Sequence, residues 1–332
     1  MSVRYFDVFN GDADGICALH QLRLADPLDS ILVTGLKHEI ALLERVRARE
    51  GDVVTVLDLS LDRNRAGLES LLGRGVHVRY FDHHYAGEIP ASDDLEPVID
   101  TAGGWCTSAL VDRHLGGRFR AWAVVGAFGD QLDALAARLG TSIGLDACAL
   151  DVLRNLGHTL NYNAYGVSDG DVAIPPAAAY RLVHAYADPF ELVAREPILQ
   201  GLARQRRVDL ENAFAVPALR RNPNCDVYLL PDAPWSRRVS GELANRLILA
   251  EPQRAHMVVI PLSAGEYGAS VRSPRGRKPA AVDFCRRFPT GGGRGEAAGI
   301  ERVGRGDLQR FLDAFEGAWS TETARPAAAL HH

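Results

Sequence analysis

Acidic residues and a pair of histidines follow the ends of three predicted strands. An Asn-Gly-Asp-Ala-Asp-Gly run at residues 10–15 follows the first strand, Asp58 ends the third, and Asp82-His83-His84 ends the fourth. Asp130 comes after an apolar helical segment. Because carboxylates at neighbouring strand ends would repel one another, we expect a cation between them. Oxygen ligands with one imidazole suit Mn²⁺ or Mg²⁺ better than a closed zinc site, so these residues predict a metal centre of that kind.

Each of these groups also has a plainer interpretation. The run at residues 10–15 could be a solvated turn, and it partly fits a calcium-binding loop. We reject the calcium loop because Gln21 stands where its closing Glu belongs and no helix leads into it. Adjacent histidines are often surface residues, Asp58 could cap a helix, and Asp130 could simply end one. It is their joint occurrence, mostly at successive strand ends, that favours a metal centre.

Short apolar strands alternate with amphipathic helices over the first hundred residues. Strands are predicted at residues 3–9, 30–34, 53–59 and 76–81, and helices at 16–24, 38–48 and 63–72. This alternation predicts βαβ units and a mainly parallel sheet. In such sheets functional residues follow the carboxyl ends of the strands, which is where the acidic groups stand.

The rest of the chain is expected to add helices and a smaller second domain of the α+β class. Helices are predicted at residues 107–114, 121–138, 177–187, 190–215, 241–249 and 303–319, strands at 226–230, 257–261 and 267–271, and a loop at 161–176. The expected organisation is a metal-binding catalytic domain at residues 1–190, a linker helix at 191–220, a substrate-binding domain at 221–322 and a tail at 323–332 left from cloning.

Composition places the chain among ordinary globular proteins. Its 332 residues suggest about two domains, and 47% hydrophobic residues allow a sizeable core. Five scattered cysteines without a C-x-x-C pair argue against zinc ribbons and disulfide frameworks and indicate a reducing compartment. We recognise no signal peptide and no apolar run long enough for a membrane span, so we expect a cytoplasmic protein without a membrane partner.

Charge is unevenly distributed along the chain. Residues 271–310 hold ten Lys or Arg and four Asp or Glu, a net +6, whereas the whole chain carries −5. An acidic body with a basic carboxyl-terminal segment suits a protein that binds metal in one place and an anion in another, although chance could also produce it. Lys37 and Lys278 are the only lysines, and we infer no function from them.

In their order and spacing the motifs resemble those of the DHH phosphoesterase family. Residues 12–15 resemble the first motif, Asp58 the second, Asp82-His83-His84 the third and Asp130 the fourth. The carboxyl-terminal half resembles the DHH-associated domain through residues 270–273, the Gly291-Gly292-Gly293-Arg294 run and residues 297–299. The likeness covers nearly the whole chain and is closest to small stand-alone members of the nanoRNase or oligoribonuclease type.

The resemblance implies a centre of two Mn²⁺ ions, with Mg²⁺ as an alternative. One ion would be held by Asp12 and Asp58, with Asn10 nearby, and the other by Asp14, Asp58, His83 and Asp130. Two such ions would activate a hydroxide and stabilise the leaving oxygen. His84 would give a proton to that oxygen, and Asp82 would orient a histidine.

The substrate-binding residues that the resemblance implies lie in the carboxyl-terminal half. They are Arg272, Ser273, Gly291, Gly292, Gly293 and Arg294. Glycine N–H groups can approach a phosphate and arginine can grip it, although the glycines by themselves could form a flexible turn. Two positions depart from the family's pattern. Asn10 stands where relatives often carry His or Asp, and this change would weaken binding of the first ion. Arg294 stands where the glycine-rich motif usually ends in His.

The expected function is a metal-dependent phosphodiesterase that hydrolyses short oligonucleotides or dinucleotides to mononucleotides. The alternatives are a phosphatase for 3′-phosphoadenosine 5′-phosphate and a nucleotide-binding protein whose catalysis is weakened through Asn10. The expected partner is a short oligonucleotide or a small phosphorylated nucleotide rather than a long duplex, since we recognise no oligonucleotide-binding barrel that would track a strand. A homodimer is left open.

Overall fold

The computed structural model describes residues 2–262 and 265–320, and the chain divides into two compact units, Met1–Arg206 and Arg207–His332. The division falls inside α9 (Pro197–Ala215), within the segment expected as a linker helix. That segment contains two helices, because α8 (Pro189–Arg195) ends before Pro197 begins α9. The tail predicted at residues 323–332 lies outside the described residues. Within the described part of the chain, no helix is long and apolar enough to cross a membrane.

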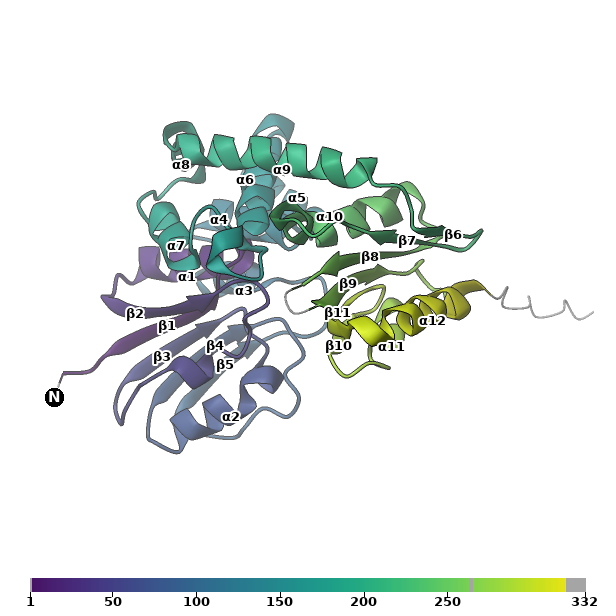
Figure 1. The fold of residues 1–332 in the computed structure, drawn as a ribbon. Coiled ribbons are helices and arrows are strands. Elements are labelled where there is room, and N and C mark those ends of the chain that lie inside the picture. Colours follow the sequence, from purple (N-terminus) through teal and green to yellow (C-terminus); the bar gives the residue numbers. More distant parts are fainter. Residues whose placement is uncertain (1, 263–264, 321–332) are drawn as a thin grey trace, which may run out of the picture. The chain divides into compact units, whose positions relative to one another are not determined.

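The first unit is built on a five-stranded sheet in which every pair of neighbours is parallel, as the sequence predicted (Figure 1). In spatial order its strands are β2 (Ser30–Gly35), β1 (Tyr5–Asn10), β3 (Val53–Leu57), β4 (His77–Asp82) and β5 (Leu95–Ile99). Sequence analysis missed β5, whose Glu96 and Pro97 interrupt an apolar pattern. Proline is tolerated there because β5 is an edge strand with one side free of ladder hydrogen bonds.

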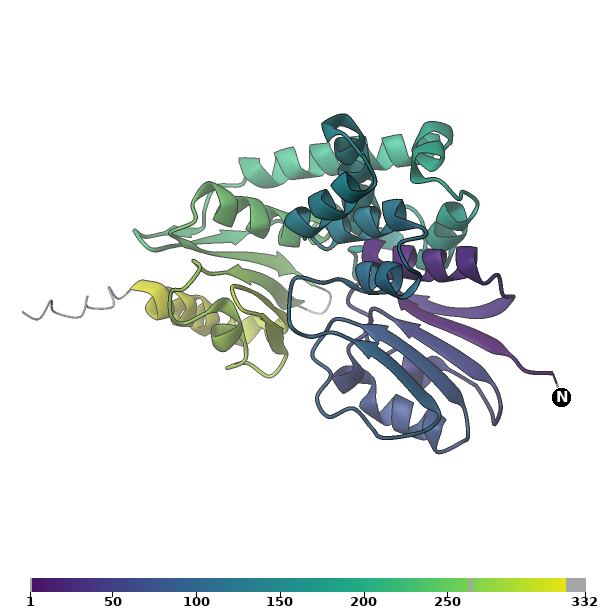
Figure 2. The same ribbon diagram turned by 180° about the vertical axis from the view of Figure 1, so that it is seen from behind.

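Helices cover both faces of this sheet, with α2 on one face and the other helices on the opposite face (Figures 1 and 2). Their bounds are α1 (Ala13–Ala25), α2 (Leu61–Leu72), α3 (Thr107–His114), α4 (Arg120–Gly129), α5 (Asp133–Ser142), α6 (Ala147–Ala164) and α7 (Pro176–His184). On the α2 face, strand residues such as Val8, Val56 and Tyr80 pack against Leu61 and Leu68. Burial of these apolar side chains is the main stabilising contribution.

The helix predicted at residues 38–48 does not form, and only a 3₁₀ turn at Leu43–Arg45 is present. Side chains from elsewhere satisfy the backbone of this segment instead. The Asn64 amide donates to the Ile40 carbonyl oxygen and accepts from the Leu43 N–H, while Glu39 accepts from the Leu36 N–H. Because these groups have partners outside a helix, the segment can bury its apolar residues in an irregular path.

The single helix predicted at residues 121–138 is broken at Asp130. Asp130 caps α4, and Gln131 adopts a left-handed backbone conformation with φ of 61°, which ends the helix before α5 begins. The loop predicted at residues 161–176 also begins too early, since α6 continues to Ala164. As a result, Asp130 stands at the end of α4, and Asn161 and Asn163 lie in the last turn of α6.

A buried ion pair fastens α1 to the sheet. Nη2 and Nε of Arg23 donate to the Asp7 carboxylate of β1, at 2.5 and 2.8 Å, and the Ser30 hydroxyl donates to Asp7 at 2.6 Å. The side chains of Arg23 and Asp7 are 3% and 0% exposed. This pair sets the position of α1, whose first turn carries the residues of the candidate site.

The second unit contains a six-stranded, mainly antiparallel sheet with α10 on one face and α11 and α12 on the other (Figure 1). Its spatial order is β10 (Gly291–Arg294), β11 (Ala297–Gly304), β9 (Glu266–Arg272), β8 (Ala255–Pro261), β7 (Cys225–Leu229) and β6 (Arg220–Arg221), with helices α10 (Pro234–Ala250), α11 (Ala281–Cys285) and α12 (Leu308–Ser320). Its core joins Phe284, Phe311, Phe315 and Trp319 to the strands.

Two predictions for this unit need correction. The helix predicted at residues 303–319 begins only at Leu308, because residues up to Gly304 continue β11. The glycine-rich run at 291–294 is a strand paired with β11 rather than a loop. The α+β character of the unit agrees with the sequence analysis.

Candidate metal centre

The acidic groups gather at the carboxyl-terminal edge of the first unit's sheet. Asn10 and Asp82 are the last residues of β1 and β4, and Asp58 follows β3 directly. Asp12 is the N-cap of α1 and Asp130 is the C-cap of α4. Neighbouring parallel strands end at the same edge, so side chains far apart in sequence come together there.

His83 is the point at which three of the carboxylates converge. Its Nδ1 lies 2.7 Å from the Trp105 carbonyl oxygen. Its Nε2 lies 3.4 Å from Asp58 Oδ1, 3.7 Å from Asp130 Oδ2 and 3.9 Å from Asp14 Oδ2. Donor atoms around one divalent ion with bonds of about 2.1 Å lie about 3 Å or more apart, and each of the three distances from His83 Nε2 is compatible with this.

The chemistry of these donors fits a divalent cation. The carbonyl of Trp105 accepts only, so Nδ1 carries a proton and Nε2 of a neutral imidazole would turn its lone pair toward the carboxylates. Burial and the carboxylates of Asp12 and Asp14 raise the pKa of Asp58 well above its ordinary value. Burial would lower the pKa of His83, but Asp58 and the neighbouring carboxylates raise it to about 10.

Thr107 at the start of α3 joins two of these carboxylates. Its N–H donates to Asp14 Oδ2 at 2.7 Å and its hydroxyl donates to Asp58 Oδ1 at 3.1 Å. The Ser108 N–H donates to Asp14 Oδ1 at 2.8 Å. Asp58 itself has a left-handed backbone with φ of 59°, a conformation that Asp and Asn tolerate better than most residues. The N-terminal residues of α3 thus hold the carboxylates of Asp14 and Asp58 in place.

Small residues let the helices approach these carboxylates closely. A Cβ added to Gly126 of α4 would lie 2.2 Å from the Ser108 hydroxyl and 3.1 Å from Asp14 Oδ1. Glycine at this position therefore permits the contact between α4 and the first turn of α3.

His84 points its Nδ1 at the neighbouring acidic residue. The distance from His84 Nδ1 to Asp82 Oδ1 is 2.7 Å, and Asp82 is completely buried while the His84 side chain is 36% exposed. An imidazole held in this way presents its other nitrogen outward, where it could give or take a proton. Asp58, His83 and His84 together also offer three atoms within 4.8 Å of one another, a spacing that could hold a metal ion.

The carboxylate of Asp12 contacts a lysine to which the sequence analysis gave no function. Asp12 Oδ1 accepts from the N–H groups of Asp14 and Gly15, at 3.0 and 3.1 Å, and Oδ2 is in close contact with the Lys37 ammonium. Asn10 Oδ1 accepts from the Asp12 N–H at 3.2 Å. Burial would raise the pKa of Asp12, but Lys37 holds it below its ordinary value.

Lys37 is itself held by the end of α6. Its ammonium lies 3.2 Å from Asn161 Oδ1 and 5.5 Å from the centre of the Tyr165 ring, and its N–H donates to the Ala164 carbonyl oxygen at 3.1 Å. The sequence analysis predicted only a loop over residues 161–176, the segment that supplies these partners. The available signal was position: Lys37 follows the carboxyl end of the second strand, as the acidic residues follow the first, third and fourth.

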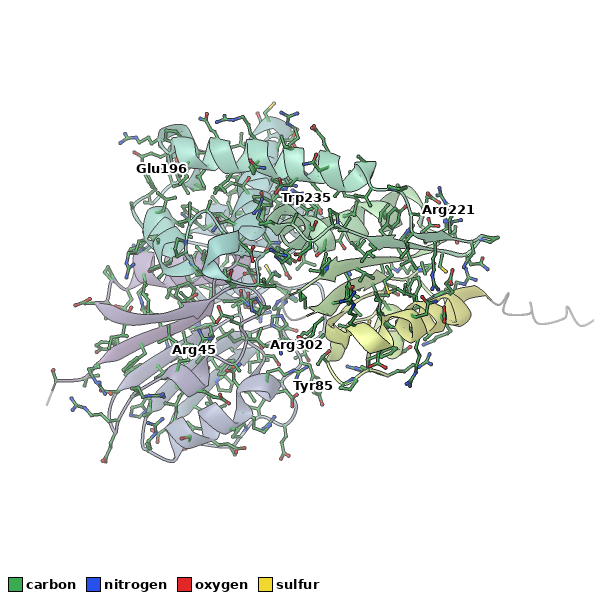
Figure 3. The ribbon with its side chains drawn as sticks, in the orientation of Figure 1. Arg45, Tyr85, Glu196, Arg221, Trp235 and Arg302 are labelled. Atoms are coloured by element: carbon green, nitrogen blue, oxygen red, sulfur yellow. The ribbon has the colours of Figure 1, made fainter. Side chains whose placement is uncertain are left out.

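Tyr85 follows the histidine pair and is among the exposed aromatic residues of the chain (Figure 3). Its side chain is 67% exposed, yet its backbone is fixed, since the Ser60 hydroxyl donates to its carbonyl oxygen at 2.9 Å. Arg65 holds the following turn by donating to the carbonyl oxygens of Ala86 and Glu88. Tyr85 therefore presents a flat ring to solvent from a fixed loop, one residue beyond His84.

The residues predicted to bind substrate lie in the second unit. Arg272 donates to Asn245 Oδ1 and to the Val271 carbonyl oxygen, and Ser273 is buried with its hydroxyl accepting from the Ala281 N–H. Added Cβ atoms would lie 1.7 Å from the Cys285 carbonyl oxygen at Gly291 and 2.4 Å from Ala298 Cα at Gly293. These glycines thus have a packing role in the sheet. The side chain of Arg294 lies outside the described atoms.

Comparison with solved structures identifies the fold. The crystal structure of exonuclease RecJ bound to manganese matches 95% of this chain and 89% of its own, with a TM-score of 0.63 and 22% identity. RecJ from Thermus thermophilus matches 95% of the chain in complexes with Mn²⁺ and Mg²⁺, with TM-scores of 0.65 and 0.58 and identities of 21% and 20%. This chain spans about half the length of those two proteins, 51% and 49%.

These matches show that the chain has the fold of the DHH family, the family to which RecJ belongs. The resemblance found in the sequence motifs is thereby confirmed at the level of the fold. No protein-family model and no curated protein sequence matches the chain.

Proposed function

We propose that this chain is a metal-dependent phosphodiesterase that releases mononucleotides from short oligonucleotides or dinucleotides. The observation that carries the proposal is the convergence of Asp14, Asp58 and Asp130 on His83 Nε2. Such a set of oxygen donors with one imidazole is suited to Mn²⁺ or Mg²⁺. The RecJ structures of the same fold contain these ions, which supports the same kind of centre here.

The protein's own residues supply the remaining chemistry. Phosphodiester hydrolysis adds water across a P–O bond, and the departing oxygen takes up a proton. His84, fixed by Asp82 and partly exposed, would hold that proton on its outer nitrogen and deliver it to the departing oxygen. A bound divalent ion would supply Lewis-acid polarisation and neutralise charge at phosphorus.

Recognition of a nucleotide is proposed for two parts of the chain. Tyr85 offers an exposed ring next to the histidine pair, and aromatic rings stack on nucleobases without sequence preference. In the second unit, the basic segment at residues 271–310 includes Arg272 and Arg294, which we retain as candidates for phosphate contacts.

The test is a turnover assay with metal-stripped protein. A 5′-phosphorylated dinucleotide and 3′-phosphoadenosine 5′-phosphate are offered with and without Mn²⁺, and products are separated by chromatography. The proposal expects Mn²⁺-dependent release of mononucleotides from the dinucleotide. Preferred release of phosphate from 3′-phosphoadenosine 5′-phosphate would select the phosphatase instead. Tight binding of either nucleotide without turnover would select a binding protein.

A further inference from the structure

We propose that the centre binds one divalent ion and that the Lys37 ammonium is the fixed cation beside Asp12, in place of a second ion. The inference rests on the proposed function only in locating the ion among Asp14, Asp58, His83 and Asp130. It replaces the two-ion centre that the sequence resemblance implied.

The residues expected to hold one of the two ions are already engaged with other groups. Asp12 Oδ1 accepts two backbone N–H groups and Asp12 Oδ2 contacts Lys37. The Asn10 side-chain oxygen, its metal-binding atom, accepts the Asp12 N–H, and the Asn10 amide donates to the Lys37 carbonyl oxygen at 3.4 Å. The acceptors on this side of the centre are therefore organised around a lysine and backbone donors.

The surroundings of Lys37 are those of a fixed ammonium rather than a mobile surface lysine. Asn161 Oδ1 and Asp12 Oδ2 both accept from it, and the Tyr165 ring faces it at 5.5 Å. The backbone of Lys37 is bonded at both of its polar groups, to Ala164 and Asn10. Lysine provides a compact charge with three donors, of which two have oxygen acceptors here, while the Tyr165 ring adds a cation–π contact.

Charge explains why one ion would be sufficient. Four carboxylates line the centre, and Lys37 neutralises that of Asp12. Asp14, Asp58 and Asp130 remain, each with a carboxylate oxygen within 3.9 Å of His83 Nε2, and Asp58 also faces the Asp12 carboxylate. Paired catalytic ions lie about 3.5–4 Å apart, so a second ion beside Asp12 would have to displace the ammonium or be repelled by it.

Metal content and spectroscopy test this directly. The full chain is stripped of metal, loaded with Mn²⁺ and freed of excess ion, and Mn per chain is measured by mass spectrometry together with the electron paramagnetic resonance spectrum. Wild-type protein is expected to hold one Mn²⁺ with the hyperfine pattern of an isolated ion. Two Mn²⁺ per chain with the spectrum of a coupled pair would overturn the proposal without any variant.

Three variants identify the role of the charge. Lys37→Met removes the ammonium at similar length and should raise the content from one Mn²⁺ to two, whereas Lys37→Arg should stay at one. Lys278→Met, a change at the other lysine, whose side chain is 82% exposed, should also stay at one. A folded Lys37→Met protein that still holds one ion, or a second ion in Lys37→Arg or Lys278→Met, would contradict the assignment.

These measurements are independent of turnover. A chain that hydrolyses no nucleotide but binds one Mn²⁺ would reject the proposed function and keep this inference. Hydrolysis by a chain that holds two ions would support the proposed function and reject this inference. If Lys37→Met did not fold, the wild-type and Lys37→Arg contents would still decide between one ion and two.

Discussion

His83 Nδ1 lies 2.7 Å from the carbonyl oxygen of Trp105, and this single contact determines which nitrogen of the imidazole faces the carboxylates. Because the carbonyl can only accept, Nε2 is the atom left for Asp14, Asp58 and Asp130. The same contact connects β4 to the loop before α3. The candidate metal ligand His83 is thereby oriented by a backbone carbonyl rather than by another titratable side chain.

Raised pKa values at this centre predict that metal-free protein loses stability as pH rises. The pKa of His83 is about 10 in the folded protein, so its stabilising contribution is present below about pH 6.5 and is lost as pH rises toward 10. The raised pKa of Asp58 likewise lowers the stability as the pH rises above the pKa that this carboxyl has in the unfolded chain. Melting temperatures measured in a chelator should therefore fall between about pH 6.5 and 9. Bound Mn²⁺ should reduce that fall, because it takes the place of the protons.

The matching controls use two histidines. His83→Asn should remove most of the pH dependence in chelator and most of the protection by Mn²⁺. His38→Asn, at an exposed position, should leave both unchanged. Equal slopes with chelator and with Mn²⁺ in the wild-type protein would contradict the prediction.

Asp58→Asn should disable turnover while preserving the fold. Asparagine tolerates the left-handed backbone at this position and keeps an acceptor for the Thr107 hydroxyl, but removes the charge. We expect kcat/KM to fall by about 10²–10³-fold, the loss typical when a group that stabilises charge in the transition state is removed. Steady-state assays with the dinucleotide measure it, and Asp93→Asn, an exposed aspartate, is the control. Full activity in Asp58→Asn would contradict the mechanism.

His84→Asn distinguishes a proton donor from a structural residue. Loss of the donor should lower kcat for a dinucleotide by about 10²–10⁴-fold. A nitrophenyl ester of a nucleotide has a leaving group that needs no proton, so its hydrolysis should be affected far less. An equal loss for both substrates would indicate that His84 acts in another way, such as metal binding with Asp58 and His83.

Tyr85→Ala should weaken substrate binding rather than the chemical step. Stacking on one base is worth about 1–3 kcal/mol, which corresponds to an increase in KM of about 5- to 160-fold. Phe214→Ala, at a half-exposed phenylalanine of α9, should leave KM unchanged. A fall in kcat at constant KM would argue against stacking.

The Arg23–Asp7 pair should stabilise the first unit substantially. Removing one partner of a buried pair leaves the other charge uncompensated, so Arg23→Ala should cost about 3–5 kcal/mol. The exposed pair between Arg45 and Glu39 should contribute no more than about 1 kcal/mol, which makes Arg45→Ala the control. Melting temperatures of the two variants provide the comparison, and similar values would contradict the ranking.

The sequence was most informative where a residue type and a strand end coincide. Asp12, Asp58 and Asp82 could be placed at one edge because strand polarity alone brings them there, and the structure has them at β1, β3 and β4. Lys37 follows the same rule at β2, but a lysine is so often a solvated surface residue that its position carried little weight. Its partner Asn161 lies 124 residues away at a helix end, a contact that local patterns do not encode.

Local patterns also misjudged segments whose backbone is satisfied from a distance. Residues 38–48 have helical spacing, yet Asn64 bonds the Ile40 carbonyl and the Leu43 N–H, and Arg74 bonds the Ala48 carbonyl. The glycines at 291–293 suggested a loop, whereas close packing against Cys285 and Ala298 explains Gly291 and Gly293 in a strand. In both cases tertiary contacts overrode the local preference.

The contact between Lys37 and the end of α6 has a consequence for the order of events during synthesis. Asp12 and Asp14 leave the ribosome early, but Asn161 and Ala164 emerge only when about half of the chain has been made. Domains fold as units as the chain emerges, at about 5–20 residues per second, so the acidic cluster and the partners of Lys37 come together only after this later segment has been made.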